Sequence, residues 1–213
     1  FPEPTHWTEL PIGYESSRQV ALKTVPGGLF GDNSFVEPPS PVKELLPPTP
    51  SAEDALGDLP RITLHLEGKL KRGPRRFTKL ARYPKGSRPN AYATLMRAWP
   101  GFESPVGIYD HVIRYLPRDY PIFERMEPGD QYPEAQKIAM QMFAEKLDEL
   151  KSKGIKVEPH SAQYEKLKKS MVPPYDPGKF PNRWRKMEPD QPARTLMAHL
   201  EKDGYTHIHY DCT

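Results

Sequence analysis

The chain has 213 residues, enough for one domain or for one larger and one smaller lobe. With 36% hydrophobic residues, 27 prolines and 14 glycines, the composition predicts a loop-rich fold with a modest core. The formal net charge is only +3, and the single cysteine excludes an intrachain disulfide, which is typical of a reducing compartment.

The first residues show no pattern of a targeting segment. The stretch FPEPTHWTEL lacks the basic and apolar regions of a signal peptide. No apolar run approaches the roughly 18 residues that a membrane helix needs, so we expect no membrane segment. The chain begins without methionine and in the middle of a pattern, and we therefore expect a piece of a longer protein.

Proline punctuates the first fifty residues, which disfavours helix interiors and central strands there. Within them, QVALKTV (19–25) is predicted as one short strand. The stretch SAEDALGDLP (51–60) predicts a helix, because Ser51 is a good N-cap and Asp54 follows it at capping-box spacing. Pro60 is predicted to end that helix.

The middle of the chain alternates short elements with a basic loop. RITLHLEG (61–68) alternates apolar and polar residues, which predicts a half-buried strand. A loop broken by Gly and Pro follows over 69–90. Apolar residues at helical spacing predict a helix over 91–99, and 117–126 is predicted as another short helix.

The clearest helix is predicted over 134–153, with Pro133 in its first turn and Gly154 just past its end. Its apolar positions form one stripe that suits packing: Ala135, Ile138, Ala139, Met142, Phe143, Leu147 and Leu150. We expect this helix to be scaffold.

The last fifty residues are predicted to contain one helix and one hairpin. Ser161 is expected to cap a helix over 161–171, and an irregular loop follows over 172–192. The chain closes in a β-hairpin over 191–213, with EKDG (201–204) as its turn. The whole set predicts the α+β class: a small, irregular, loop-rich domain with short strands, hairpins and a few helices.

Motifs for catalysis are mostly missing. The sequence contains no G-x-G-x-x-G, P-loop, G-x-S-x-G or H-E-x-x-H pattern. A metal site would use four residues of the hairpin, namely His199, His207, His209 and Cys212, and the alternative is a pair of structural histidines beside a chance cysteine. Cys212 as a nucleophile needs a base, and His111 is either a general base or a capping histidine.

Basic residues are concentrated in two places. Nine Lys/Arg and no acid lie between Lys69 and Arg88, which favours a polyanion as partner; the alternative is a solvated loop. NRWRKM (182–187) adds three cations around Trp184. Arg185 and Arg194 are candidates for reading guanine edges in a major groove, whereas Trp184 is expected to fill the edge of the core.

Several stretches, in order, resemble the DNA (cytosine-5) methyltransferases. FPEPTH (1–6) resembles the segment that follows the family's glutamine-arginine motif, and SAEDALGDLP resembles the next helix. DHVIRYL (110–116) and ERMEPGDQYPE (124–134) resemble parts of the target recognition region, and NRWRKMEPDQPARTLMAHLEKDGYTHIHYD (182–211) resembles its closing segment. The family's S-adenosylmethionine loop, proline-cysteine nucleophile, glutamate-asparagine-valine motif and arginine motif are absent.

The resemblance implies a target recognition domain over 61–213, preceded by a segment (1–60) that leads in from a catalytic domain outside this sequence. It implies double-stranded DNA and that catalytic domain, on the same or a separate chain, as partners. The implied DNA contacts are Arg183, Arg185, Lys186, Arg194 and Thr195, with a second set in the basic loop: Lys71, Arg72, Arg75, Arg76 and Lys79. No catalytic or metal residue is expected in the chain.

The parent enzyme would use S-adenosylmethionine to methylate C5 of cytosine, whereas this chain alone is expected to bind no cofactor and to be inactive. Such a protein would serve a restriction–modification system or act alone, in the bacterial cytoplasm at the nucleoid, or in the nucleus of a eukaryote. Two alternatives stay open: a protein-interaction subunit of a split methyltransferase, and a small metal-dependent enzyme built on the hairpin histidines and Cys212.

Overall fold

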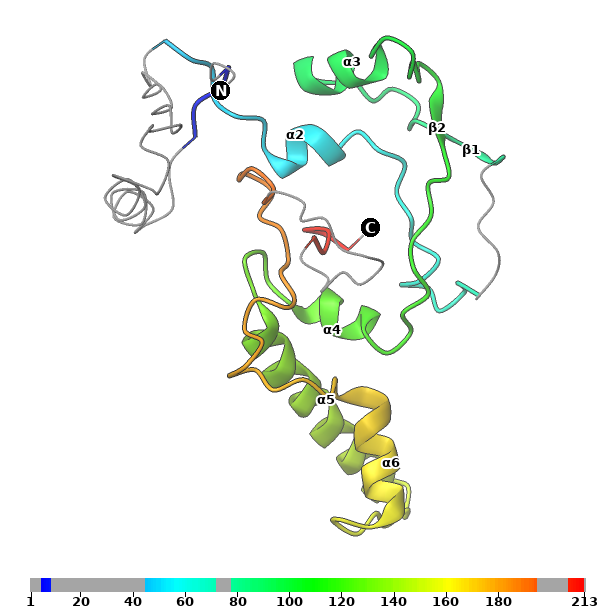
Figure 1. The fold of residues 1–213 in the computed structure, drawn as a ribbon. Helices are drawn as coiled ribbons and strands as arrows, with labels where there is room; N and C mark the ends of the chain where they lie inside the picture. Colours follow the sequence, from blue (N-terminus) through cyan, green and yellow to red (C-terminus); the bar gives the residue numbers. More distant parts are fainter. Residues whose placement is uncertain (1–4, 9–44, 72–77, 195–206, 213) are drawn as a thin grey trace, which may run out of the picture. The chain divides into compact units, whose positions relative to one another are not determined.

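In the computed structural model of the chain, the residues described are 5–8, 45–71, 78–194 and 207–212 (Figure 1). The chain divides into two units, Phe1–Pro50 and Ser51–Thr213. In the first unit, Trp7 and Pro48 form an isolated parallel bridge, and the Trp7 amide donates to the Pro47 carbonyl at 2.8 Å. The strand predicted over 19–25 lies outside the described residues.

The second unit begins with helix α2 (Ala52–Leu56), and its start confirms the predicted capping box. The Ser51 hydroxyl accepts from the Asp54 amide, while the Asp54 carboxylate accepts from the Ser51 amide at 2.9 Å. The predicted end at Pro60 is wrong, because the helix stops at Leu56. The residues after it form a turn, and the Asp58 carboxylate in this turn accepts from the guanidinium of Arg97.

Helix α3 (Ala91–Arg97) confirms the helix predicted over 91–99, with Asn90 as its N-cap. Asn90 also donates from its side-chain amide to the Asp54 carbonyl at 2.9 Å, so it joins α3 to α2. The Arg97 guanidinium lies 2.6 Å from the Asp58 carboxylate and stacks on the Tyr83 ring, 3.5 Å from its centroid. These contacts fix α2 and α3 together (Figure 1).

The strand predicted over 61–68 is wrong, because this stretch folds into turns. The amides of residues 69 and 70 both donate to the Leu64 carbonyl, and Gly68 takes a φ of 65°. The alternating leucines therefore gain no buried face, and Leu64 remains 49% exposed. Alternation alone does not make a strand when no partner strand pairs with its backbone.

A short strand lies instead in the stretch that we expected to be loop. Strand β1 (Leu80–Arg82) pairs antiparallel with β2 (Gly107–Tyr109), in the register Ala81 to Ile108. A Cβ on Gly107 would lie 2.2 Å from the Ala81 carbonyl oxygen, so only glycine permits this approach. The sequence between the two strands contains α3, and their pairing therefore depends on tertiary structure.

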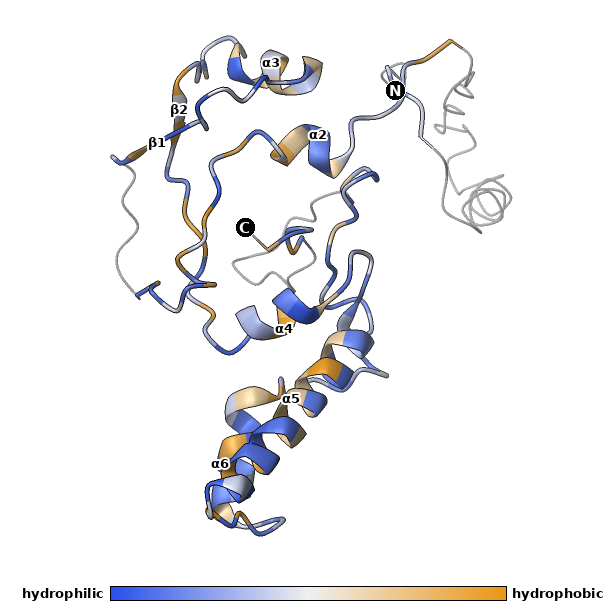
Figure 2. Cartoon of the chain, turned by 180° about the vertical axis from the view of Figure 1, so that it is seen from behind, coloured by the Kyte–Doolittle hydropathy of each residue, from blue (hydrophilic) through white to orange (hydrophobic). Residues whose placement is uncertain are grey.

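Two helices supply most of the buried core, and a third packs against it with partly buried side chains. Helices α4 (Tyr120–Arg125), α5 (Tyr132–Ser152) and α6 (Ala162–Met171) confirm the predictions over 117–126, 134–153 and 161–171. Helix α5 packs against both α4 and α6. Apolar and polar residues alternate around α5 and α6, as Figure 2 shows by colour, and the inward positions of α5 are buried.

The centre of the core is Trp184, which is fully buried although it lies in the irregular loop after α6. Its ring meets Phe123 edge-on at 5.0 Å and Tyr132 at 5.3 Å. Phe143 of α5 makes a similar contact with Tyr164 of α6. The prediction that Trp184 belongs to the core is confirmed, although it lies at the centre rather than at the edge.

The fold class is confirmed: the described residues form a small, loop-rich α+β arrangement with a two-stranded sheet and short helices. The predicted closing hairpin falls mostly outside the described residues, including its turn. Of that stretch, Ile208 forms a parallel bridge with Lys186. Among the described residues, no helix is long and apolar enough to cross a membrane.

Candidate nucleic-acid interface

Residues 182–194, here called the arginine segment, run across the core between two other parts of the chain. The Lys186 amide donates to the Asp130 carbonyl at 3.0 Å, and the Gly129 amide donates to the Lys186 carbonyl at the same distance. On the other side, the Ile208 amide donates to the Arg185 carbonyl at 3.0 Å. Because buried Trp184 anchors the same stretch, its backbone is held at several points.

Arg183 lies at the start of this segment and is half-buried against aromatic rings. Its guanidinium carbon lies 3.7 Å from the centroid of the Tyr175 ring and 6.0 Å from that of Phe180. Stacking of this kind fixes the plane of a guanidinium while its edge can still donate hydrogen bonds. Arg183 is therefore held in place before any ligand arrives.

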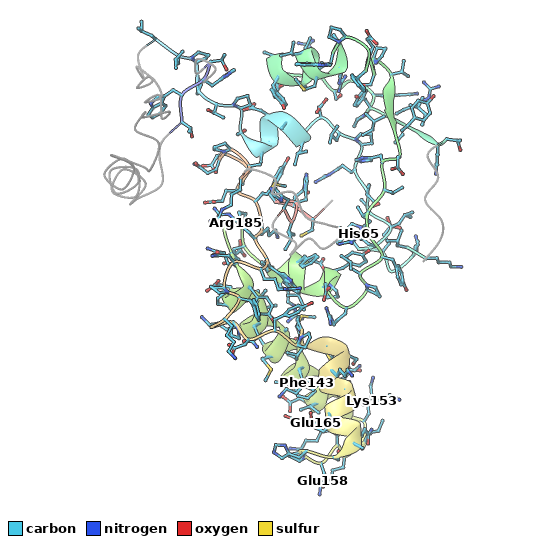
Figure 3. The ribbon with its side chains drawn as sticks, viewed as in Figure 1. His65, Phe143, Lys153, Glu158, Glu165 and Arg185 are labelled. Atoms are coloured by element: carbon cyan, nitrogen blue, oxygen red, sulfur yellow. The ribbon has the colours of Figure 1, made fainter. Side chains whose placement is uncertain are left out.

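Arg185 is paired with an acid that the sequence prediction did not name. Figure 3 labels Arg185. Its Nη2 lies 2.7 Å from the Glu188 carboxylate, and the two side chains are 23% and 36% exposed. A salt bridge with this partial exposure adds only modestly to stability. It does, however, restrict the rotamers of a long side chain.

Arg194 shares a small surface pocket with this pair. Burial lowers the pKa of Arg194, and the neighbouring charge of Arg185 lowers it further, whereas Glu188 raises it. Two guanidinium groups and one carboxylate thus line the same pocket. Thr195, the next predicted contact, lies outside the described residues.

Lys186 occupies a different environment from its arginine neighbours. Its side chain points into the core and is 5% exposed. The ammonium group donates to the Phe123 carbonyl at 3.0 Å and to the Met126 carbonyl at 2.6 Å. Lys186 therefore has a structural role in the core and does not belong to the exposed surface of the arginine segment.

The basic loop contributes a second group of cations. Lys71 and Lys79 are exposed, and both line a cavity of about 560 Å³ together with Arg61 and Lys69. Apolar side chains such as Leu64 and Val112 form much of the rest of its wall, and Thr63 and His111 add polar groups. The other predicted contacts of this set, Arg72, Arg75 and Arg76, lie outside the described residues.

The histidines at the chain end bind neighbouring groups. His207 Nε2 lies 3.1 Å from the Arg194 carbonyl, and His209 Nδ1 lies 2.7 Å from the Asp211 carboxylate. Burial lowers the pKa of His209, although Asp211 opposes this shift. His199 lies outside the described residues, and the described ones contain no group of three or more acids, histidines or cysteines able to hold a metal.

Cys212 and His111 also have structural partners. The Cys212 thiol lies 3.1 Å from the Phe123 carbonyl, and burial raises the pKa of this thiol, which disfavours the thiolate. His111 Nε2 lies within hydrogen-bond distance of the Pro60 carbonyl. The geometry thus matches the structural alternative for His111 rather than a general base.

Glu188 is the functional candidate that sequence reasoning missed. The signal that could have found it is the spacing of Arg185 and Glu188, three residues apart with opposite charge. A spacing of three residues predicts a contact only on a helix. Because the arginine segment is irregular, the spacing alone did not predict this ion pair.

Comparison with known proteins gives one informative relative. No family model matches the chain, and no solved structure matches it. The chain is 32% identical over 209 residues, 98% of its own length, to a protein of Oceanobacillus iheyensis named "Putative type II methyltransferase". It spans 42% of that relative's length. This similarity supports a methyltransferase-related role for the chain.

Proposed function

We propose that the chain is the DNA target recognition part of a DNA (cytosine-5) methyltransferase. The observation that carries this proposal is the arginine segment, which presents Arg183, Arg185 and Arg194 from a backbone tied to the core. The motifs quoted above and the similarity to a type II methyltransferase both support it.

The two groups of cations suit two different kinds of DNA contact, one with bases and one with phosphates. Arginines whose planes are fixed by a ring or a carboxylate suit the paired acceptors of a guanine in the major groove. Exposed lysines on flexible stems suit phosphates, where position matters less than charge. We therefore assign base reading to the arginine segment, and phosphate contact to Lys71, Lys79 and the rest of the basic-loop set.

The chemistry of methyl transfer belongs, in this proposal, to a catalytic domain outside these 213 residues. Methylation at C5 requires a thiolate that attacks C6 of cytosine. The single cysteine, Cys212, follows aspartate rather than proline, and its raised pKa disfavours the thiolate. S-adenosylmethionine would accordingly be bound by the catalytic domain.

That catalytic domain is also the proposed protein partner. Seven large apolar side chains between residues 95 and 115 are 44% to 78% exposed: Leu95, Trp99, Phe102, Val106, Tyr109, Val112 and Tyr115. Such a concentration of exposed apolar groups is typical of a surface that another protein covers.

Duplex binding tests the proposal. We expect the chain to bind double-stranded DNA weakly, with an affinity that falls steeply between low and physiological salt, because phosphate contacts release counterions. Lys79→Ala should weaken binding to all duplexes alike. Arg185→Ala should change which sequences are enriched from a randomised pool, with a loss of about 1–3 kcal/mol of discrimination.

Fluorescence anisotropy at several salt concentrations measures the affinities, and sequencing of bound duplexes measures the preference. An affinity that does not change with salt would refute the phosphate assignment. If Arg185→Ala enriched the same duplex sequences as the unsubstituted chain, base reading by the arginine segment would be refuted.

A further inference from the structure

We propose that Glu188 is a positioning residue for sequence reading: its carboxylate holds the guanidinium of Arg185 and allows that of Arg194 to lie beside it. The inference rests on the proposed function and deepens it. Glu188 would orient the arginine side chains that read the sequence. Those arginines would donate hydrogen bonds to the acceptors on the edge of a base.

The geometry gives Glu188 a defined place. Its carboxylate lies 2.7 Å from Arg185 Nη2. Behind it lies Gly129, where an added Cβ would stand 3.4 Å from the Glu188 carboxyl carbon. Gly129 has a φ of 91°, which disfavours any L side chain, and its amide donates to the Lys186 carbonyl. The carboxyl group therefore rests against bare backbone that is itself bonded to the arginine segment.

The charges explain why an acid belongs there. Burial lowers the pKa of Arg194 most, the like charge of Arg185 lowers it further, and Glu188 acts in the opposite direction. The pocket that these three residues line therefore holds one carboxylate and two guanidinium groups, which gives it a net positive charge. A guanine edge offers two acceptors in one plane, and a phosphate offers several in any direction.

Fixing the guanidinium of Arg185 in advance should favour binding of a guanine edge over binding of a phosphate. A guanidinium whose Nη2 is already bound has fewer rotamers to lose when it meets a planar base edge. A phosphate gains much less from that restriction, because its oxygens accept from many directions. Glu188 should therefore matter for sequence discrimination more than for total affinity.

The chain supplies a matched control in Asp190, an exposed acid two residues further along the same segment. Glu188→Gln and Asp190→Asn each remove one negative charge and keep the size of the side chain. If Glu188 acted only through its charge, the two variants would behave alike. Arg185→Lys adds a further comparison, because it keeps the cation but removes the fork.

The experiment measures affinity of the 213-residue chain and its variants for a duplex enriched from a randomised pool and for a scrambled duplex of the same composition. We expect Glu188→Gln to lower the ratio of the two affinities roughly 3- to 10-fold, while scrambled-duplex binding stays equal or rises. Asp190→Asn should raise both affinities together and keep the ratio. Arg185→Lys should lower the ratio as Glu188→Gln does.

Equal effects of Glu188→Gln and Asp190→Asn would overturn the inference, and so would a Glu188→Gln chain that discriminates as well as the unsubstituted one. Replacing guanine by 7-deazaguanine in the enriched duplex, which removes N7, separates the two acceptor sources. If that change leaves the Glu188→Gln effect intact, Glu188 orients a phosphate contact and the inference fails. An unsubstituted chain that shows no discrimination would instead refute the proposed function itself. Thermal unfolding of each variant checks that it is folded.

Discussion

Four consecutive residues of the arginine segment show how much a side chain's role depends on the backbone that carries it. Arg183 and Arg185 lie partly exposed, whereas Trp184 and Lys186 are buried. In the sequence NRWRKM the three cations look equivalent. In the structure, the segment is paired on both sides, and the alternation of an extended chain sends every second side chain inward.

Lys186 gives the first prediction about stability. Lys186→Met keeps the apolar stem but removes the donors, which leaves the Met126 carbonyl without this bond, whereas the Phe123 carbonyl still faces the Cys212 thiol. We expect the free energy of unfolding to fall by about 1–3 kcal/mol, as for a buried acceptor that loses its donor. Urea denaturation of the chain measures it.

Lys179→Met is the control, because Lys179 is exposed in the same loop. Its effect should stay within about 0.5 kcal/mol. If the two lysine variants were equally stable, Lys186 would not hold the two carbonyls as described. A buried lysine of this kind could not be recognised from sequence, because the carbonyls that bind it come from α4 and its C-cap, far away along the chain.

Among the secondary-structure elements, those with local signals were predictable and those with distant partners were not. Ser51, Asn90 and Ser161 each cap a helix within three residues of themselves, so the chain carries that information locally. Strand β1 depends on β2, which lies beyond α3, and the turns over 61–68 depend on the lack of such a partner. The alternation of apolar and polar residues in 61–68 indicated one apolar face of a strand. It could not indicate whether another part of the chain would cover that face.

Asn90 links two elements and yields the prediction at this level. Its Oδ1 accepts from the Ala93 amide at 2.7 Å, and its Nδ2 donates to Asp54. Asn90→Ala removes both functions, and we expect a loss of about 0.5–2 kcal/mol from the cap alone. Asn90→Ser keeps a capping oxygen but cannot reach across as the amide does, so it should recover part of that loss.

Thermal unfolding of the two Asn90 variants and the unsubstituted chain gives the comparison. Equal stability of Asn90→Ser and Asn90→Ala would show that the cap contributes nothing. Full recovery by Asn90→Ser would show that the link to α2 contributes nothing.

The chain as a whole exposes both cations and large apolar side chains. Cations stand on the arginine segment and around the 560 Å³ cavity, and large apolar side chains between 95 and 115 are exposed. The candidate site was predictable in part: the sequence identified the arginines, but not Glu188, whose place depends on Gly129 and on the pairing of the segment. Charge clusters are visible in a sequence, whereas the residues that orient them are not.

The prediction at this level concerns catalysis. With S-adenosylmethionine and duplex DNA, the 213-residue chain should transfer no methyl groups, because its only cysteine is half-buried with a raised pKa. Incorporation of a labelled methyl group into DNA measures this. Turnover above that of a protein-free control would contradict the proposed separation of recognition from chemistry.

The burial of Trp184 has a practical consequence for work in solution. The chain has three tryptophans; Trp99 is 47% exposed, and Trp7 belongs to the first unit. If Trp7→Phe and Trp99→Phe are combined, all indole emission comes from one fully buried ring directly beside Arg185 in the sequence. Binding at the arginine segment and unfolding of the core then become readable from the same intrinsic fluorophore, without a label on protein or DNA.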